Sequence, residues 1–322
     1  MKRLASLALA LLIVAGAAAP AQAAFPGVAG PIAYPKVNVN EAEDTGGLLA
    51  HGPRLRQRPR QLTSDARDVS PSYSPNGRTI VFAGNRDPGT ARGSHLYLMN
   101  ADGSDVKALT SGDFYDSNPS FSPGGRQVVF DRSVGSSRIS HIFIVNVDSS
   151  GLRQITNDAG TDYDPTFAPN GRRIAFVSNR DSSARSDRSN IFSIGPSGTH
   201  LRLLIGGRRN ESEPDFSPNG RRIAFVSTRD HGPNIFVARS NGRHARALTH
   251  SRHDCFDSAC YLGPSWAPDG KHIAFLGIGR ESSDLQVMRP DGSQSKEFDE
   301  AGTEEEGFGS SIGAPAWGPK PR

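Results

Sequence analysis

Long hydrophobic runs, a strong net charge and helical periodicity are missing from most of this sequence. After residue 23 no segment is apolar enough to cross a bilayer, so we expect no integral membrane segment in the mature chain. The formal net charge is only +4, which is too small to indicate nucleic-acid binding. Long stretches of helical periodicity are absent, which favours many short strands.

The single apolar run lies at the N-terminus. A positively charged start precedes apolar residues from Leu4 to Ala19, and a small-x-small tripeptide ends at Ala23. This pattern predicts a secretory signal peptide over residues 1–23, with an uncleaved anchor helix as the alternative. Cysteine occurs only twice and not at the cleavage site, which argues against a lipoprotein. We therefore expect residues 24–322 to be periplasmic or secreted.

Glycine and proline, by contrast, are abundant and form part of an internal repeat. Each unit begins with a proline, continues through an aromatic residue and a tight turn containing glycine, and enters an apolar strand. The units begin at Pro71, Pro119, Pro165, Pro214, Pro264 and Pro315. A period of about 50 residues with several strands in each unit is typical of a propeller blade.

Each unit contains four strand signals, of which the last ends in Leu-Thr or a similar pair. Residues 32–34 match the second strand and residues 61–63 match the fourth, so the N-terminus begins a blade that lacks its first strand. Residues 315–317 supply that strand. We predict an all-β, six-bladed β-propeller of four-stranded antiparallel blades, forming one domain over residues 24–322. Pairing of the N- and C-terminal strands in one blade closes the ring.

The repeat resembles the units of TolB-type propellers. The shared features are Pro-x-aromatic, Ser-Pro-x-Gly, an apolar strand, an Arg-Asp loop and a terminal Leu-Thr, and they extend from about residue 30 to the end. The resemblance implies a periplasmic or secreted module that docks a protein on its loop face. TolB carries a further domain before its propeller, which we expect to be missing here, so contacts through that domain are not implied.

Charged residues gather where a propeller has its channel mouth. The acidic candidates are Asp68, Asp116, Asp162, Asp164, Glu211 and Glu213. The loops after the second strands contribute Arg86, Arg132, Arg180, Arg229 and Arg280. The last loop between blades adds Glu297, Asp299, Glu300, Glu304, Glu305 and Glu306. We interpret these residues as a surface for a partner protein; in the alternative, the Asp and Arg residues pair between neighbouring blades and only hold the loops.

The two cysteines, Cys255 and Cys260, are expected to form a disulfide in an exported protein. The alternative is a zinc site completed by His250 and His253.

We predict no catalytic residue and no cofactor, although calcium would suit the acidic mouth. His95 and His141 occupy equivalent places before third strands, where other blades have Asn or Asp, and this mixture favours loop capping. Residues 309–313 match a nucleophile elbow, but no histidine follows them. We interpret the chain as a monomeric, non-catalytic scaffold that binds an envelope or extracellular protein. The alternative is a polysaccharide lyase or hydrolase that uses channel polar groups or a bound metal.

Overall fold

The computed structural model describes residues 27–37, 46–52, 59–86, 93–134, 139–181, 188–207, 209–230, 232–251, 260–278, 283–297 and 314–321. The predicted signal peptide over residues 1–23 lies outside this part of the chain. In the part that is described, no helix has the length and apolar character needed to span a membrane.

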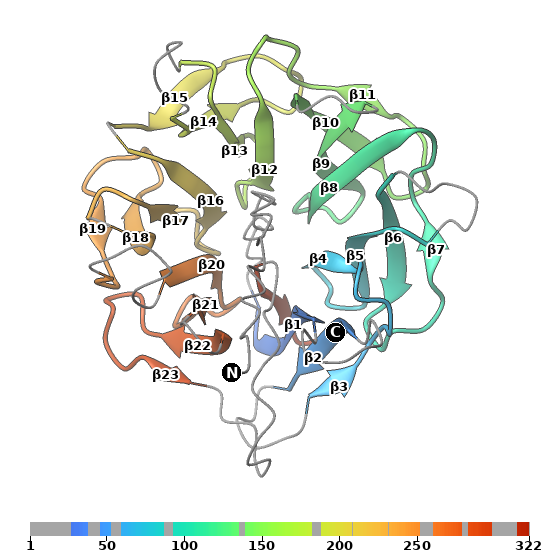
Figure 1. Cartoon of the computed structure of the whole chain (residues 1–322), viewed down its shortest axis with the longest axis horizontal. Coiled ribbons are helices and arrows are strands. Elements are labelled where there is room, and N and C mark those ends of the chain that lie inside the picture. The colour runs from blue at the N-terminus through green and yellow to red at the C-terminus, as the bar shows by residue number, and fades with distance from the viewer. Residues whose placement is uncertain are drawn as a thin grey trace, which may run out of the picture.

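The strands form six four-stranded antiparallel sheets, which stand as blades around a central axis (Figure 1). The innermost strands are β4 (Val69–Tyr73), β8 (Phe114–Phe121), β12 (Asp162–Phe167), β16 (Glu211–Phe216), β20 (Cys260–Trp266) and β24 (Ala316–Pro319). The second strands are β1 (Ala29–Val37), β5 (Thr79–Gly84), β9 (Gln127–Val134), β13 (Ile174–Ser178), β17 (Arg222–Ser227) and β21 (Ile273–Ile278). The all-β, six-bladed propeller predicted from the repeat is confirmed.

The outer half of each blade contains the third and fourth strands. The third strands are β2 (Gly46–His51), β6 (His95–Asn100), β10 (Ser140–Asn146), β14 (Asn190–Ile194), β18 (Asn234–Arg239) and β22 (Ser283–Met288). The fourth strands are β3 (Arg60–Gln61), β7 (Lys107–Ala108), β11 (Arg153–Gln154), β15 (Arg202–Ile205), β19 (Arg246–Ala247) and β23 (Lys296–Glu297).

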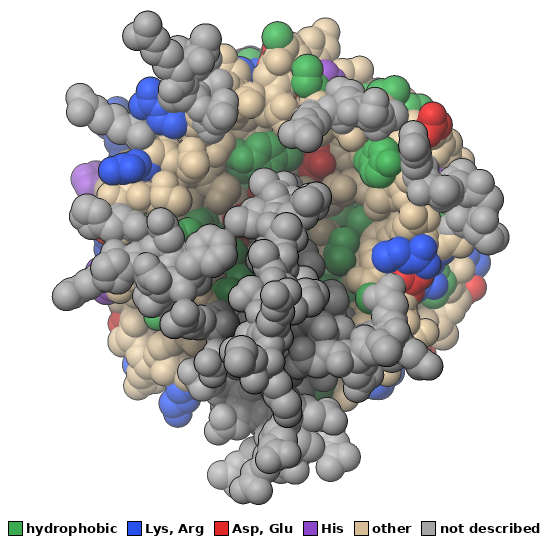
Figure 2. Space-filling model, in the orientation of Figure 1, with side chains coloured by type: hydrophobic (Ala, Val, Ile, Leu, Met, Phe, Trp, Pro, Cys, Tyr) green, Lys and Arg blue, Asp and Glu red, His purple; other side chains and the backbone are tan. Residues whose placement is uncertain are grey.

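The alternating strand directions give the ring two chemically different faces. The short turns after the first and third strands all lie on one face, which we call the turn face. The connections after the second and fourth strands lie on the other, which we call the loop face. In Figure 2 hydrophobic and acidic side chains are visible around the central opening, while basic side chains lie nearer the rim.

The core lies between the blades. The second strands are apolar on both sides because each sheet packs against two neighbours. Five of the six contribute a phenylalanine that is fully buried, Phe82, Phe130, Phe176, Phe225 and Phe275, and β1 contributes the buried Tyr34. The five phenylalanines and Tyr34 belong to five clusters of buried side chains that follow one another around the ring.

The Leu-Thr pairs that end several repeats have a structural purpose. The hydroxyl Oγ1 of Thr110 accepts a hydrogen bond of 2.9 Å from the backbone N–H of Leu96, the second residue of the third strand in the same blade. The equivalent bonds run from Leu48 to Thr63, Ile142 to Thr156 and Ile235 to Thr249. A very short fourth strand is thereby joined to the third beyond its own backbone ladder.

The two ends of the chain meet in one sheet, as the repeat predicts. The C-terminal strand β24 pairs antiparallel with β1, with Ile32 opposite Trp317 and Ala33 opposite Ala316. The indole N–H of Trp317 also donates to the carbonyl of Gly30 at 3.1 Å. In Figure 1 the C-terminus accordingly lies beside β1 and β2.

Candidate functional site

Four consecutive blades carry the same type of ion pair at the channel mouth on the loop face. The pairs are Asp68–Arg86, Asp116–Arg132, Asp162–Arg180 and Glu211–Arg229. Both partners belong to one blade, so the interpretation that such residues pair between neighbouring blades is wrong. The hairpin register explains this, because an acidic residue near the start of the first strand lies opposite the end of the second, as Asp116 does opposite Arg132.

The pairs differ mainly in how far the arginine reaches solvent. Arg132 donates through Nε and Nη2 to the carboxylate of Asp116 at 2.6 and 2.8 Å, and only 4% of its side chain is exposed. Arg229 donates through Nη2 to Glu211 at 2.7 Å, and 32% of its side chain is exposed. Both acidic side chains are buried. The buried carboxylates therefore bind the inner side of each guanidinium and do not form an acidic ring that is open to solvent.

Aromatic rings also support these arginines. The guanidinium of Arg132 lies 4.2 Å from the ring centroid of Phe114, within the range of cation–π attraction. The other contacts are Arg86 over Phe82 and Tyr97, Arg180 over Phe176 and Phe192, and Arg229 over Phe225 and Phe236. Each guanidinium thus has a fixed orientation before any partner arrives.

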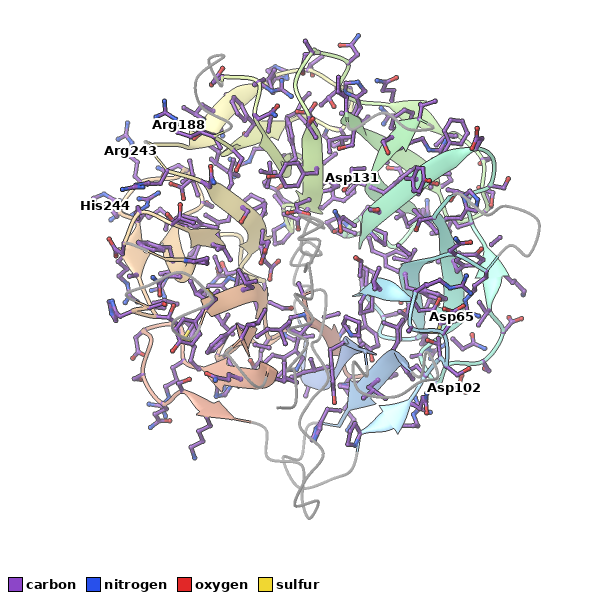
Figure 3. The ribbon with its side chains drawn as sticks, viewed as in Figure 1. Asp65, Asp102, Asp131, Arg188, Arg243 and His244 are labelled. Carbon is purple, nitrogen blue, oxygen red and sulfur yellow. The ribbon has the colours of Figure 1, made fainter. Side chains whose placement is uncertain are left out.

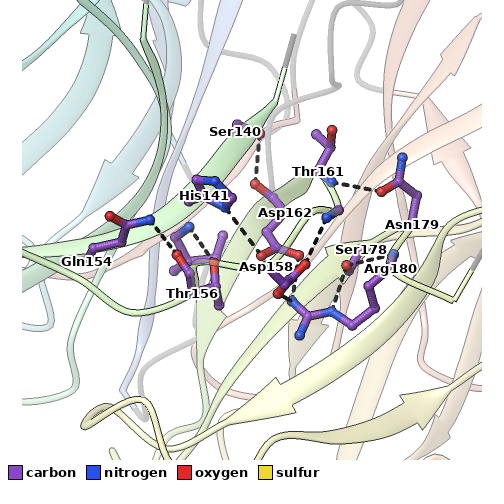
Figure 4. A network of polar contacts seen from close by, with 12 residues as sticks. Ser140, His141, Gln154, Thr156, Asp158, Thr161, Asp162, Ser178, Asn179 and Arg180 are labelled. Atoms are coloured by element: carbon purple, nitrogen blue, oxygen red, sulfur yellow. Dashed lines mark hydrogen bonds and ion pairs between the residues drawn. The ribbon is translucent and has the colours of Figure 1, made fainter. Parts of the chain in front are cut away.

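Asp162 lies where two neighbouring blades meet (Figure 4). Within its own blade it accepts a 2.7 Å hydrogen bond from Arg180, which also pairs with Asp158 at 2.9 Å. From the β8–β11 blade, the hydroxyl of Ser140 donates to the Asp162 carbonyl at 2.8 Å. The ring atom Nδ1 of His141 lies 3.9 Å from the Asp162 carboxylate. Contacts from the β8–β11 blade therefore help to hold Asp162, and Asp162 in turn orients Arg180 on the loop face.

The residues that begin the third strands act partly as loop caps. The side-chain oxygen of Asn234 accepts hydrogen bonds from the backbone of Ser251 at 2.6 Å and from the hydroxyl of Thr249 at 3.0 Å. Asn190 accepts from the backbone of Gly207 at 3.3 Å. Within the described ranges, no three His, Cys, Asp or Glu side chains are grouped so that they could hold a metal ion.

A second feature is a ring of backbone bulges in the inner strands, which line the channel. Every inner strand that precedes β24 has a bulge at the residue before its proline, and there the backbone has a positive φ: Ser70, Asn118, Asp164, Glu213 and Gly263. Such a conformation is uncommon for residues other than glycine. The bulge side chains link blade to blade, as when the Ser70 hydroxyl donates to the Asn118 amide oxygen at 3.3 Å.

Three buried acidic residues meet on one side of this bulge ring. Asp131, at the channel side of β9 (Figure 3), accepts from the Asn118 amide at 2.9 Å and from the Asp164 backbone N–H at 3.3 Å. Glu213 accepts from the backbone N–H of Gly263. Neither carboxylate oxygen of Asp164 has a hydrogen-bond partner among the described residues, although the side chain is buried. We call Asp131, Asp164 and Glu213 the carboxylate cluster.

Burial changes the protonation of the carboxylate cluster. It raises the pKa of Asp131 and that of Glu213 to about 7 in each case. For Asp164 burial raises the pKa well above its usual range, and the charges of Glu213 and Asp131 raise it further. The titrations of the three groups are therefore coupled, and those of Asp131 and Glu213 lie near neutral pH.

The sequence analysis named Asp164 and Glu213 but missed Asp131. A signal was present, because Asp131 directly follows the apolar run from Val128 to Phe130, at a position where other blades have Ala83, Val177 and Val226. Glu304, Glu305 and Glu306 lie outside the described residues. Cys260 is disulfide-bonded, and Cys255, the only other cysteine in the sequence, also lies outside them.

Comparison with protein-family models assigns this chain to a family. The model of the TolB beta propeller domain matches residues 114–320. The chain belongs to the TolB β-propeller family. No curated protein matches this TolB-type propeller at a significant level.

Solved structures agree on the fold. TolB from Acinetobacter baumannii is 22% identical with a TM-score of 0.73, and the match covers 90% of this chain and 67% of that one. Putative TolB from Agrobacterium tumefaciens is 17% identical with a TM-score of 0.64, covering 91% of this chain and 100% of that one. Hydrazine synthase from Kuenenia stuttgartiensis is 16% identical with a TM-score of 0.71, covering 92% and 48%. At these identities the TolB-type propeller shares a fold with all three.

Proposed function

We propose that this TolB-type propeller is a non-catalytic, exported and monomeric scaffold that binds an envelope or extracellular protein through its loop face. The observation that carries the proposal is the series of oriented arginines at the channel mouth. Arg86, Arg180 and Arg229 are each held by a buried carboxylate and by aromatic rings while part of the side chain stays exposed. A guanidinium fixed in this way loses little conformational freedom when a partner binds.

The predicted site residues have different roles in this proposal. Asp68, Asp116, Asp162 and Glu211 position the arginines from beneath. The arginines donate to backbone carbonyls or carboxylates of the partner, while Glu304, Glu305 and Glu306 contribute the opposite charge from the last loop. A surface with both signs selects partners by complementary charge. Asp164 and Glu213 face the channel, and no cofactor is required.

The signal-peptide pattern and the TolB family together support a periplasmic or secreted location. The fold alone does not define an activity, because propellers carry many functions. The proposal therefore rests on the loop-face arginines, and these supply the test.

The test begins with capture of the partner from envelope extract on the mature protein, followed by affinity measurement with both purified proteins. The double variant Arg86→Lys/Arg229→Lys keeps both charges but loses the planar fork, so we expect the dissociation constant to rise about tenfold or more. The matched control, Arg126→Lys/Arg172→Lys on the turn face, should bind as the parent does. The triple variant Glu304→Gln/Glu305→Gln/Glu306→Gln should weaken binding most at low salt. Equal affinity of all these variants would overturn the proposal.

A further inference from the structure

The turn face carries two complete rings of basic side chains. The first ring directly follows the innermost strands, with five members in the turns after them and Lys320 immediately after β24: Arg78, Arg126, Arg172, Arg221, Lys271 and Lys320. The second ring consists of the first residue of every fourth strand: Arg60, Lys107, Arg153, Arg202, Arg246 and Lys296. All twelve are exposed, so every blade presents two cations to the same side.

The acidic residues on this face are fewer and are mostly engaged in their own turns. Asp102 accepts hydrogen bonds from the backbone N–H and hydroxyl of Ser104, and Asp148 and Asp291 bond in the same way to the serines that follow them. Asp105 pairs with Lys107 at 2.9 Å. The face therefore carries a clear excess of positive charge, although the whole chain is nearly neutral.

The turn after each innermost strand shows how this excess arises. The side-chain oxygen of Asp269 accepts a 2.9 Å hydrogen bond from the Lys271 backbone and so stabilises its turn. Asn170 and Asn219 make the same bond at 3.0 Å without bringing a negative charge. Asparagine thus keeps the turn geometry, but it provides no negative charge to balance the positive charge of the arginine in the same turn.

Apolar side chains stand directly beside these cations. Leu152 and Leu201, each 46% exposed, immediately precede members of the second ring. Val28 is 68% exposed, and its carbonyl accepts a hydrogen bond from the backbone of Lys320 at 2.8 Å. A soluble polyanion gains nothing from exposed leucine and valine, whereas a bilayer interface accepts both apolar side chains and cations.

The same face is hollowed between blades. A pocket of about 600 Å³ between the β8–β11 and β12–β15 blades is lined by Arg126, Gln127, Asn146 and Asn170. A cation with several amide groups around it provides donors for the phosphate of a lipid headgroup.

We propose that the turn face docks on an anionic phospholipid bilayer. The two basic rings contact the headgroups, while Val28, Leu152 and Leu201 enter the interfacial region. The loop face then points away from the membrane and stays open to a protein partner. This proposal is independent of the identity of that partner.

Vesicle co-sedimentation of the mature protein tests the proposal. We expect binding to vesicles of phosphatidylcholine with 30% phosphatidylglycerol, no binding to phosphatidylcholine alone, and loss of binding as salt is raised. A cation near an anionic surface contributes a factor of about five to the partition coefficient. Arg172→Gln/Arg221→Gln should therefore lower partitioning about 30-fold, with the far-ultraviolet spectrum and melting temperature unchanged.

The matched control is Arg188→Gln/Arg209→Gln, which removes the same charge from connections of the loop face and should partition as the parent does. A third variant, Leu152→Ser/Leu201→Ser, should weaken vesicle binding severalfold and leave binding to dextran sulfate unchanged. Equal losses in the two arginine variants would show only a net-charge effect and overturn the proposal. Dextran sulfate binding without vesicle binding would also overturn it and assign the face to a soluble polyanion.

Discussion

Asp164 lies in surroundings that disfavour the ionised form of its carboxyl group. Its side chain is buried, both oxygens lack hydrogen-bond partners among the described residues, and two other buried carboxyl groups raise its pKa. The equivalent bulge residue in the preceding blade is Asn118, which holds nearly the same positive φ, 56° against 51°. Asparagine therefore fits the backbone at this position without new strain.

We predict that Asp164→Asn stabilises the protein at pH 8 by roughly 1–3 kcal/mol, because it removes a buried carboxyl group whose ionisation is opposed by burial and by Glu213 and Asp131. Denaturant unfolding followed by fluorescence at several pH values measures this. The raised pKa values mean that the folded state binds protons more tightly than the unfolded chain does. Carboxyl groups of the unfolded chain titrate at about pH 4. The free energy of unfolding of the parent should therefore fall as the pH rises from about 4 to above about 7, where Asp131 and Glu213 titrate in the folded protein.

The variant supplies its own check, because its stability should depend less steeply on pH over that range. If Asp164→Asn were as pH-dependent as the parent, or less stable at pH 8, the carboxylate cluster would not be coupled in the way described.

At the residue scale the sequence could predict positions but not partners. The recurring acidic and basic residues at the channel mouth were visible in the repeat, yet their pairing within one blade depends on the hairpin register. Asp131 was overlooked because it is followed by Arg132 and Ser133 and so looks like the polar end of an apolar strand. Its importance comes from Asn118 and Asp164, which reach it from the innermost strands of two neighbouring blades, β8 and β12.

At the scale of the strand, each blade depends on a short fourth strand that makes few backbone bonds of its own. In the β8–β11 blade, Thr156 accepts a 3.0 Å hydrogen bond from Ile142, and both groups are buried. The repeated Leu-Thr ending was recognisable in the sequence, but its reason lies in this bond to the third strand. In the β12–β15 blade the fourth strand has four residues and ends at Ile205 without a threonine. This blade therefore has a longer fourth strand where the threonine side-chain bond is absent.

We predict that Thr156→Val lowers the free energy of unfolding by about 1–3 kcal/mol, since valine has nearly the same shape but leaves the Ile142 N–H without its acceptor. Amide hydrogen exchange should show faster exchange at Ile142 and along β11, and thermal unfolding measures the stability loss. Thr161→Val is the control, because Thr161 does not link a third strand to a fourth. Protection at Ile142 equal to that in the parent would contradict the assigned role of the hydroxyl.

At the scale of the whole molecule, the seam decides whether six blades close. Five complete units and two partial ones could be counted from the sequence, and the closing strand was placed correctly. The detail that could not be predicted is how β24 is held. Trp317 is only half-buried and stacks on His272 at 6.2 Å, whereas Ala316, Gly318 and Pro319 are buried. Gly318 lies against the ring of Tyr73, where an added Cβ would come within 2.6 Å of the ring.

Deleting residues 314–322 removes the innermost strand of one blade and leaves one edge of β1 unpaired. The loss includes the β1–β24 ladder, the bond from the Trp317 backbone to Ser265 at 3.1 Å, and the cover over Tyr73. We predict a destabilisation of at least about 3 kcal/mol, together with self-association through the open edge. Thermal unfolding and light scattering measure both effects, and Lys320→Ala, which only shortens an exposed side chain in the same segment, should behave as the parent does.

A peptide added in trans separates loss of this strand from general damage to the fold. If the deletion opens a specific gap, a synthetic peptide of residues 314–322 should pair with β1 as an added strand, raise the melting temperature of the truncated protein and suppress its association. A scrambled peptide of the same composition should do neither, because the gap accepts only a strand that places alanine toward the core and glycine against Tyr73. A truncated chain that stayed monomeric and melted within a few degrees of the parent would show that the seam does not hold the ring together.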